Sequence, residues 1–354
     1  MPYEAGMDYW MRFSCIFPFC TASALFAGGM QGNYYADENR EIFLLPKSAA
    51  MAGSDRAVGR SASPLSNAAG LPGDSAKEVA IAYAGYFQNT YSTGSLSYIG
   101  PVDGRSCIGI SASYIVIPDI EIYDDTIIPA NIPTKTSSDI FFRISYGRRL
   151  ARFGDRFSVT AGAAINAERL NLVGWTGYGM GVDAGMSVFY YSRERHSVAT
   201  AGVLLENLTT NYTHWSSEYK EYAYPHMRLG LGWQKEIDYI YGKITLTYLS
   251  PDVFSNEGIN KYGSDSLADG LNVESPEVKR VATDPLMLFV SGRFGAEYTI
   301  MKTISFRVGV DMKVGTISFG GGLHLFGNRA GFDFAYLDHD LASTYKLSVL
   351  LKWF

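Results

Sequence analysis

The amino-acid sequence predicts an all-β fold: a transmembrane antiparallel β-barrel of about 14 strands, with an N-terminal plug segment in its lumen. Three observations predict this fold class. Side chains alternate between an apolar and a charged face, short connections alternate with long ones, and the composition is rich in Tyr and Gly. A helical membrane protein is not expected, because beyond the N-terminus no stretch of about 18 apolar residues occurs.

The alternation of side chains is clearest near the C-terminal end, in residues 286–354. Apolar side chains such as Phe306 and Val308 alternate there with charged side chains such as Arg307 and Asp311. A period of two places the two sets on opposite faces of a strand. A charged face is not expected in a protein core, so we expect lipid on one side and a polar lumen on the other. In two neighbouring strands the expected charged face comprises Arg293, Glu297, Arg307, Asp311 and Lys313.

The composition is that of an envelope protein rather than of a nucleic-acid-binding protein. The 354 residues include 25 Tyr and 37 Gly, whereas charged residues make up only 18%. Lumen-facing residues dilute the apolar average of a barrel, which agrees with the mean hydropathy of -0.01. The net charge of -5 and the lack of a basic run exclude a surface that tracks phosphates.

Residues 1–29 predict a cleaved signal peptide, with a possible start at Met11. Arg12 precedes an apolar stretch at residues 13–26, and small residues follow it. The stretch is shorter than the roughly 20 residues of a membrane-spanning helix. We therefore expect export to the outer membrane of a diderm bacterium. Two of the three cysteines lie in this segment, so the mature chain would keep only Cys107 and form no intrachain disulfide.

Residues 30–77 differ in composition from the rest of the chain. They are rich in Ala, Gly and Ser, which favours irregular structure with short helical turns. One interpretation is a disordered periplasmic linker. The other is an N-terminal plug in the barrel mouth, where small residues let the backbone approach the lumen wall closely.

Residues 78–354 are expected to form the barrel itself. Short turns near Gly154, Glu194, Glu236, Met301 and Gly327 alternate with long connections, as in outer-membrane barrels with short periplasmic turns and long outer loops. The long connections are expected at residues 118–138, 207–223 and 250–285. The predicted strands are residues 78–87, 91–100, 107–117, 139–147, 156–167, 178–191, 197–206, 224–235, 239–249, 286–298, 303–313, 316–326, 330–337 and 344–353.

No pattern in the sequence points to catalysis, a cofactor or a metal. The five histidines lack metal-ligand spacing, and no nucleophile elbow of the G-x-S-x-G type occurs. We therefore expect a protein without enzymatic activity. The functional candidates are charged residues expected to line the lumen. They either pair with one another and brace the wall or the plug, or they line a pore. These candidates are Arg293, Glu297, Arg307, Asp311, Asp183 and Arg228.

Several short motifs follow one another in an informative order. The plug motif consists of Asn67, Ala68, Ala69, Gly70 and Leu71. Further motifs lie at residues 206–208, 225–230, 295–298, 306–309 and 332–336. Taken in this order, they resemble the PorV/PorQ family of outer-membrane proteins, relatives of the FadL-type transporters. The family's plug signature is Asn-Pro-Ala-Gly-Leu, and Ala68 stands in place of its Pro.

The resemblance implies a plugged barrel with one of two roles. PorV-type members are accessory to type IX protein secretion, binding exported cargo by its C-terminal domain and delivering it to the cell surface. FadL-type relatives take up hydrophobic small molecules through the barrel. The residues also leave open a soluble periplasmic all-β binding protein. The expected partners are outer-membrane lipid, with secretion-machinery proteins and cargo or hydrophobic small molecules, and no nucleic acid.

Overall fold

The computed structural model describes residues 38–61, 63, 65–72, 76–87, 89–122, 132–194, 196–209, 211–238, 241–254, 285–338 and 342–353. The signal peptide expected at residues 1–29 lies outside the described residues. The same holds for the first residues of the expected plug and for most of the long connection at 250–285.

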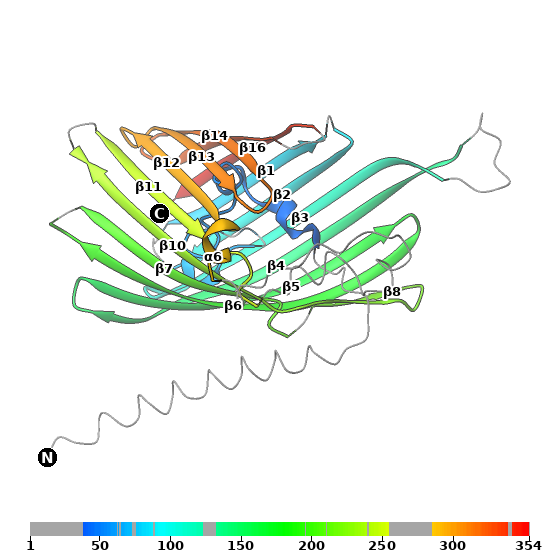
Figure 1. Cartoon of the computed structure of the whole chain (residues 1–354), viewed down its shortest axis with the longest axis horizontal. Helices are drawn as coiled ribbons and strands as arrows, with labels where there is room; N and C mark the ends of the chain where they lie inside the picture. Colours follow the sequence, from blue (N-terminus) through cyan, green and yellow to red (C-terminus); the bar gives the residue numbers. More distant parts are fainter. Residues whose placement is uncertain are drawn as a thin grey trace, which may run out of the picture.

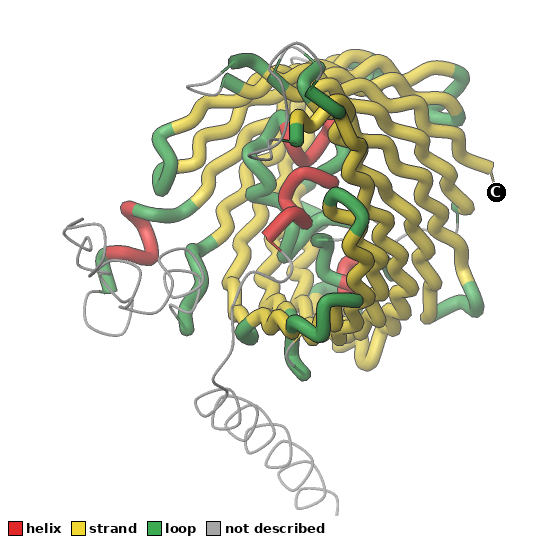
Figure 2. Tube along the Cα trace, turned by 90° about the vertical axis from the view of Figure 1, so that its right-hand side faces the viewer, coloured by secondary structure: helices red, strands yellow, loops and turns green. Residues whose placement is uncertain are grey.

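Sixteen strands form one antiparallel sheet, and fourteen of them close into a barrel (Figures 1 and 2). Each strand of the ring pairs with its neighbour in the sequence, except that β7 pairs with β10. The pairing of β16 with β1 completes the ring. The predicted all-β barrel of about 14 strands is confirmed. The ring consists of β1 (Lys77–Tyr86), β2 (Tyr91–Pro101), β3 (Ser106–Glu121), β4 (Thr134–Phe153), β5 (Phe157–Leu172), β6 (Trp175–Ser192), β7 (Ser197–Glu206), β10 (His226–Ile237), β11 (Gly242–Leu249), β12 (Arg293–Ile300), β13 (Ile304–Asp311), β14 (Thr316–Leu325), β15 (Ala330–Leu337) and β16 (Thr344–Trp353).

The two ends of the barrel differ in how their strands are joined. At one end, where β1 begins and β16 ends, the connections are short turns, such as residues 154–156 and 301–303. We call this the termini end. The opposite end carries the long connections and is called the loop end. One of these lies at residues 207–225, of which residues 207–223 were expected to be a loop. It contains β8 (Asn211–Trp215) and β9 (Lys220–Ala223), a hairpin that extends the wall alongside β6.

The wall is uneven in height. β4 and β6 contain 20 and 18 residues, whereas β11, β12, β13 and β15 contain eight each. Accordingly, the expected loop at residues 118–138 is in part strand, since β3 reaches Glu121 and β4 begins at Thr134. The longer strands carry the wall further at the loop end (Figure 1).

The outer and inner faces of the wall follow the predicted alternation. On β13, Phe306 is 57% exposed and points outward, whereas Arg307 is 4% exposed and points inward. On β16, Leu347 points outward and Lys346 inward in the same way. Lys313 departs from the prediction, because β13 ends at Asp311 and Lys313 lies exposed in the following turn.

The described residues between positions 38 and 76, called the inner segment, lie inside the ring of strands (Figure 2). They contain the helical turns η1 (Glu38–Phe43), α3 (Pro46–Ala49) and η2 (Ala68–Gly70). η2 packs against β4, β5 and β6, while α3 packs against β14, β15 and β16 on the opposite side of the ring. The inner segment therefore crosses the whole lumen.

The predicted strand at residues 286–298 is wrong in its first half. Residues Met287–Val290 form the helical turn α6, and β12 begins only at Arg293. This run is apolar at every position, so it lacks the alternation that favours a strand with one buried face. The hydroxyl of Tyr248 donates a hydrogen bond to the carbonyl of Leu288, and the ring of Phe289 stacks on that of Tyr248.

No helix in the described part of the chain is long and apolar enough to cross a membrane.

Candidate functional site

The backbone of the inner segment contacts the backbone of the wall at glycine positions. A Cβ atom added at Gly309 of β13 would overlap the backbone of Met51 and Ala52. A Cβ added at Gly162 of β5 would overlap the backbone of Ala68 in the same way. Glycine at these positions allows two backbones to meet at a distance that any other residue would prevent.

The predicted plug motif is fully buried at the contact between the inner segment and the wall. Asn67 caps η2, because its Oδ1 accepts a hydrogen bond of 2.9 Å from the amide of Ala69. Its Nδ2 donates to the carbonyls of Ala57 and Val203, each at 3.0 Å. One side chain thus ties two parts of the inner segment to β7. The buried residues of the motif are Asn67, Ala68, Ala69, Gly70 and Leu71.

Asp183 of β6 is the centre of a first group of buried charges. Its carboxylate accepts hydrogen bonds from Arg143 of β4 and, at 2.9 Å, from Asn166 of β5. Arg40 of the inner segment lies 3.5 Å from the same carboxylate. Arg143 also donates at 2.8 Å to the carbonyl of Ser66. This group therefore joins three strands to both ends of the inner segment.

A second group surrounds Glu206 at the end of β7. Arg56 of the inner segment and Arg228 of β10 both donate to its carboxylate, Arg228 at 2.9 Å. Arg56 also donates at 3.2 Å to Glu41. Arg56 is 2% exposed and is the largest fully buried side chain among the described residues.

Glu41 continues this network along the wall to β12 and β13. Its carboxylate accepts a 2.8 Å hydrogen bond from Arg293 of β12, and Arg293 also pairs with Asp311 of β13 at 2.7 Å. Partial burial raises the pKa of Glu41, but the positive charges of Arg293, Arg56 and Arg228 outweigh this and lower it to about 2.

A third group lies on β12, β13 and β15. Arg307 donates to Glu297 at 2.6 Å and to Asp333 at 2.7 Å. All six predicted charged residues thus lie in these groups, but only four pair with one another, Arg293 with Asp311 and Arg307 with Glu297. The partners of the other two are Arg143 for Asp183 and Glu206 for Arg228, neither of which is among those six. The expectation that a charged face does not lie in a core needs correction. These charges are buried, and direct ion pairs with the wall and the inner segment compensate their desolvation.

Lys346 of β16 holds the inner segment through backbone carbonyls. It is 2% exposed, and its Nζ donates to the carbonyls of Ile42 and Leu44 at 2.7 and 3.1 Å. The same ammonium lies 5.2 Å from the ring centre of Tyr86. Sequence reasoning missed this residue, although its place between Tyr345 and Leu347 marks it as inward-facing.

The loop end of the lumen is closed by apolar packing. Phe43 of the inner segment packs on Phe141 of β4 with 4.6 Å between ring centres. Trp215 of β8 and Leu170 of β5 belong to the same buried cluster. The hairpin is held over this cluster by Glu168, whose carboxylate accepts a 2.6 Å hydrogen bond from Thr213.

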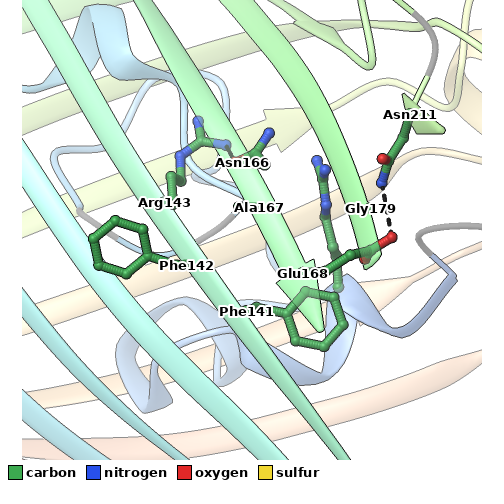
Figure 3. Close-up of a pocket in the computed structure, with 9 residues that line it drawn as sticks. Phe141, Phe142, Arg143, Asn166, Ala167, Glu168, Gly179 and Asn211 are labelled. Atoms are coloured by element: carbon green, nitrogen blue, oxygen red, sulfur yellow. Dashed lines mark hydrogen bonds between the residues drawn. The ribbon is translucent and has the colours of Figure 1, made fainter. Parts of the chain in front are cut away.

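Little space remains beside this cluster. Figure 3 shows a cavity between Arg143, Glu168 and Asn211, with the side chain of Asn211 bonded to the Glu168 carboxylate. Its volume is about 10 Å³, which is room for one water molecule at most. The described side chains around this cavity are therefore closely packed.

The termini end differs, because it contains an open chamber of about 920 Å³. Lys47 of α3 projects into it from the inner segment, and Lys243 of β11 and His324 of β14 line its wall. Its rim is formed by the turns that follow β10, β12 and β14. None of these three residues was among the predicted site residues, since the chamber depends on where the inner segment stops.

No protein-family model matches this chain, and no curated protein matches its sequence. Solved structures with a similar fold include the TodX deltaS2S3 mutant monoaromatic hydrocarbon channel, at 10% identity and a TM-score of 0.46, covering 87% of this chain and 98% of that chain. A Pseudomonas aeruginosa FadL homologue has the same values. The CymD monoaromatic hydrocarbon channel is 13% identical, with a TM-score of 0.46, covering 88% of this chain and 97% of that chain.

Proposed function

We propose that the protein is a non-enzymatic transport barrel of the outer membrane, of the FadL-like kind. Residues 38–76 act as its plug, and hydrophobic small molecules pass when the plug moves. The outward face supports the membrane location, because large apolar side chains such as Ile81, Phe306 and Leu347 are more than half exposed on it. An extract that releases the protein without detergent would instead favour a soluble periplasmic binding protein.

The observation that carries the transport proposal is the shared apolar cluster at the loop end. The inner segment supplies Phe43, and the wall supplies Phe141 and Trp215. Movement of the inner segment would withdraw Phe43 and open an apolar surface facing the loop end. Elsewhere the segment is held by ionic contacts and by small apolar clusters such as that of Leu71 with Ile99, and such contacts re-form when the segment returns.

A reversible disulfide tests whether the inner segment must move. A Cβ atom at Gly232 of β10 would lie 3.6 Å from the Cβ of Val58. This separation suits a disulfide, so Val58→Cys with Gly232→Cys should lock the segment to the wall. We expect the oxidised protein to lose uptake of a labelled aromatic hydrocarbon into cells, and a reductant to restore it.

The two single-cysteine variants are the controls, since neither can form the lock. Cys107 is buried and unchanged in all three proteins. Uptake that is equally fast in the oxidised and reduced double variant would refute passage by movement of the plug. Uptake that is unaffected by deletion of the protein would refute the transport proposal as a whole.

A second candidate function is the accessory role in type IX secretion. It is favoured by aromatic side chains exposed on the sheet at the loop end, among them Trp175 and Tyr178 of β6 and Tyr212 of β8, which pairs with Met180 of β6. Such side chains are typical of protein-binding surfaces. Replacing Tyr178 and Tyr212 by Ser should then deplete surface-attached proteins and leave hydrocarbon uptake intact. An unchanged set of surface proteins after gene deletion would exclude this role.

A further inference from the structure

The chamber at the termini end has the size of a ligand site. Its volume of about 920 Å³ lies within the range of small-molecule sites, which is roughly 300–1,000 Å³. α3 of the inner segment limits it on the inside, and the short turns form its rim. Its contents would therefore come from the termini end, whether or not the plug moves.

We infer that this chamber binds a small organic anion through the ammonium groups of Lys47 and Lys243. Within the described part of the chain, neither ammonium has a hydrogen-bond or ion-pair partner. Lys47 is exposed to the chamber from α3, and Lys243 lines it from the start of β11. Two unpaired ammonium groups at one cavity leave positive charge that a bound anion would neutralise.

The carboxylates around the chamber are already engaged or stand at its rim. Glu297 interacts electrostatically with both lysines, but its carboxylate is bonded to Arg307 at 2.6 Å. Lys352 is likewise paired with Glu78 at 3.1 Å. Among the described lining residues four lysines face three carboxylates, a surplus of one positive charge. These residues are Lys47, Lys243, Lys302 and Lys352 with Glu236, Asp238 and Glu297.

Uncharged polar groups complete the lining. The hydroxyls of Thr299 and Ser305 lie 2.9 Å apart, and Nε2 of His324 lies 3.3 Å from the Ser305 hydroxyl. These groups can satisfy the polar part of a ligand beyond its anionic group. Carboxylates and phosphates share the required chemistry, so the test separates them.

The test is equilibrium dialysis of the full-length protein in a non-ionic detergent. The probes are octanoate, glycerol phosphate and neutral octanamide. We expect the protein to bind one anionic probe and to bind octanamide at least about tenfold more weakly, because a charge-assisted hydrogen bond contributes about that factor. Lys47→Gln and Lys243→Gln should each raise the dissociation constant of the anion about tenfold, and the double variant should abolish binding.

Lys220→Gln is the matched control, since Lys220 is an exposed lysine on β9 at the other end of the barrel. It should bind as the unchanged protein does. As a readout that needs no substitution, a water-soluble amine reagent should label Lys47, and the bound anion should protect it. Preferred binding of octanoate would identify the anion as a carboxylate, and preferred binding of glycerol phosphate would identify it as a phosphate. Equal binding of octanamide, unchanged binding by the double variant, or no protection of Lys47 would each overturn the proposal.

The proposed transport is tested separately by the Val58→Cys and Gly232→Cys lock. The locked protein should still bind the anion, because the chamber exists with the inner segment in its present position. Failure of transport would therefore leave this inference standing, and loss of anion binding would leave the transport proposal standing.

Discussion

Charged side chains have different surroundings in the two halves of the lumen. Towards the loop end, buried arginines such as Arg143 and Arg56 each contact a carboxylate directly, and almost no space remains. At the termini end, Lys47 and Lys243 face a chamber of about 920 Å³, and among the described residues neither ammonium has a hydrogen-bond or ion-pair partner. Removing a charge from water is costly unless it is paired, whereas a charge in an open chamber keeps its hydration. We propose from this contrast that the first half is a seal and the second a vestibule.

The largest effect is expected at Asp183, whose carboxylate is shared by two buried arginines. Asp183→Ala would leave the guanidinium groups of Arg143 and Arg40 buried without their common partner. We expect a loss of about 3–5 kcal/mol in the free energy of unfolding, the usual cost of breaking a buried ion pair. Urea unfolding of the lipid-refolded barrel, followed by Trp fluorescence, measures it. A stability equal to that of the unchanged protein would show that water reaches these charges.

A smaller effect is expected at Gly309, where the backbone of the inner segment contacts a glycine of the wall. Gly309→Ala would force the backbone of Met51 and Ala52 off β13, at a cost of about 1–3 kcal/mol for overpacking. Its control is Gly321→Ala on β14, where an added Cβ would meet nothing closer than 3.5 Å. Urea unfolding should separate the two variants by at least about 1 kcal/mol. Equal stability of the two would contradict the close contact.

The lysine that holds the inner segment allows a local test of the seal. Lys346→Met keeps most of the side-chain length but removes the donor to the carbonyls of Ile42 and Leu44. We expect a cost of about 1–2 kcal/mol for the two carbonyls, and faster amide hydrogen exchange confined to residues 40–46. Unchanged exchange in these residues would show that Lys346 does not hold the segment.

The smallest effect is expected at the solvent-exposed termini end. Asp155 pairs there with Arg193 at 2.9 Å, but the two side chains are 58% and 74% exposed. Exposed ion pairs contribute at most about 1 kcal/mol. Asp155→Ala should therefore change the free energy of unfolding by less than that amount, although it is the same substitution as Asp183→Ala. Comparable losses in the two variants would remove the distinction between seal and rim.

The sequence by itself determined the barrel wall. A period of two assigns each strand residue to one face, so the inward position of Arg307 and the outward position of Phe306 follow from the alternation alone. The same argument placed Asp183, Arg228 and Arg293 inside the ring. It failed at residues 286–290, where apolar side chains occupy every position and no face is specified.

Only the tertiary structure decided what these inward charges contact. The inner segment has no periodic pattern, so its sequence does not show that Arg56 would meet Glu206, or that Lys346 would bond to the carbonyl of Ile42. These partners lie 150 and 304 positions apart in the chain. Their contacts exist because the closed ring folds around the segment, and the chamber exists because the segment fills only part of that ring.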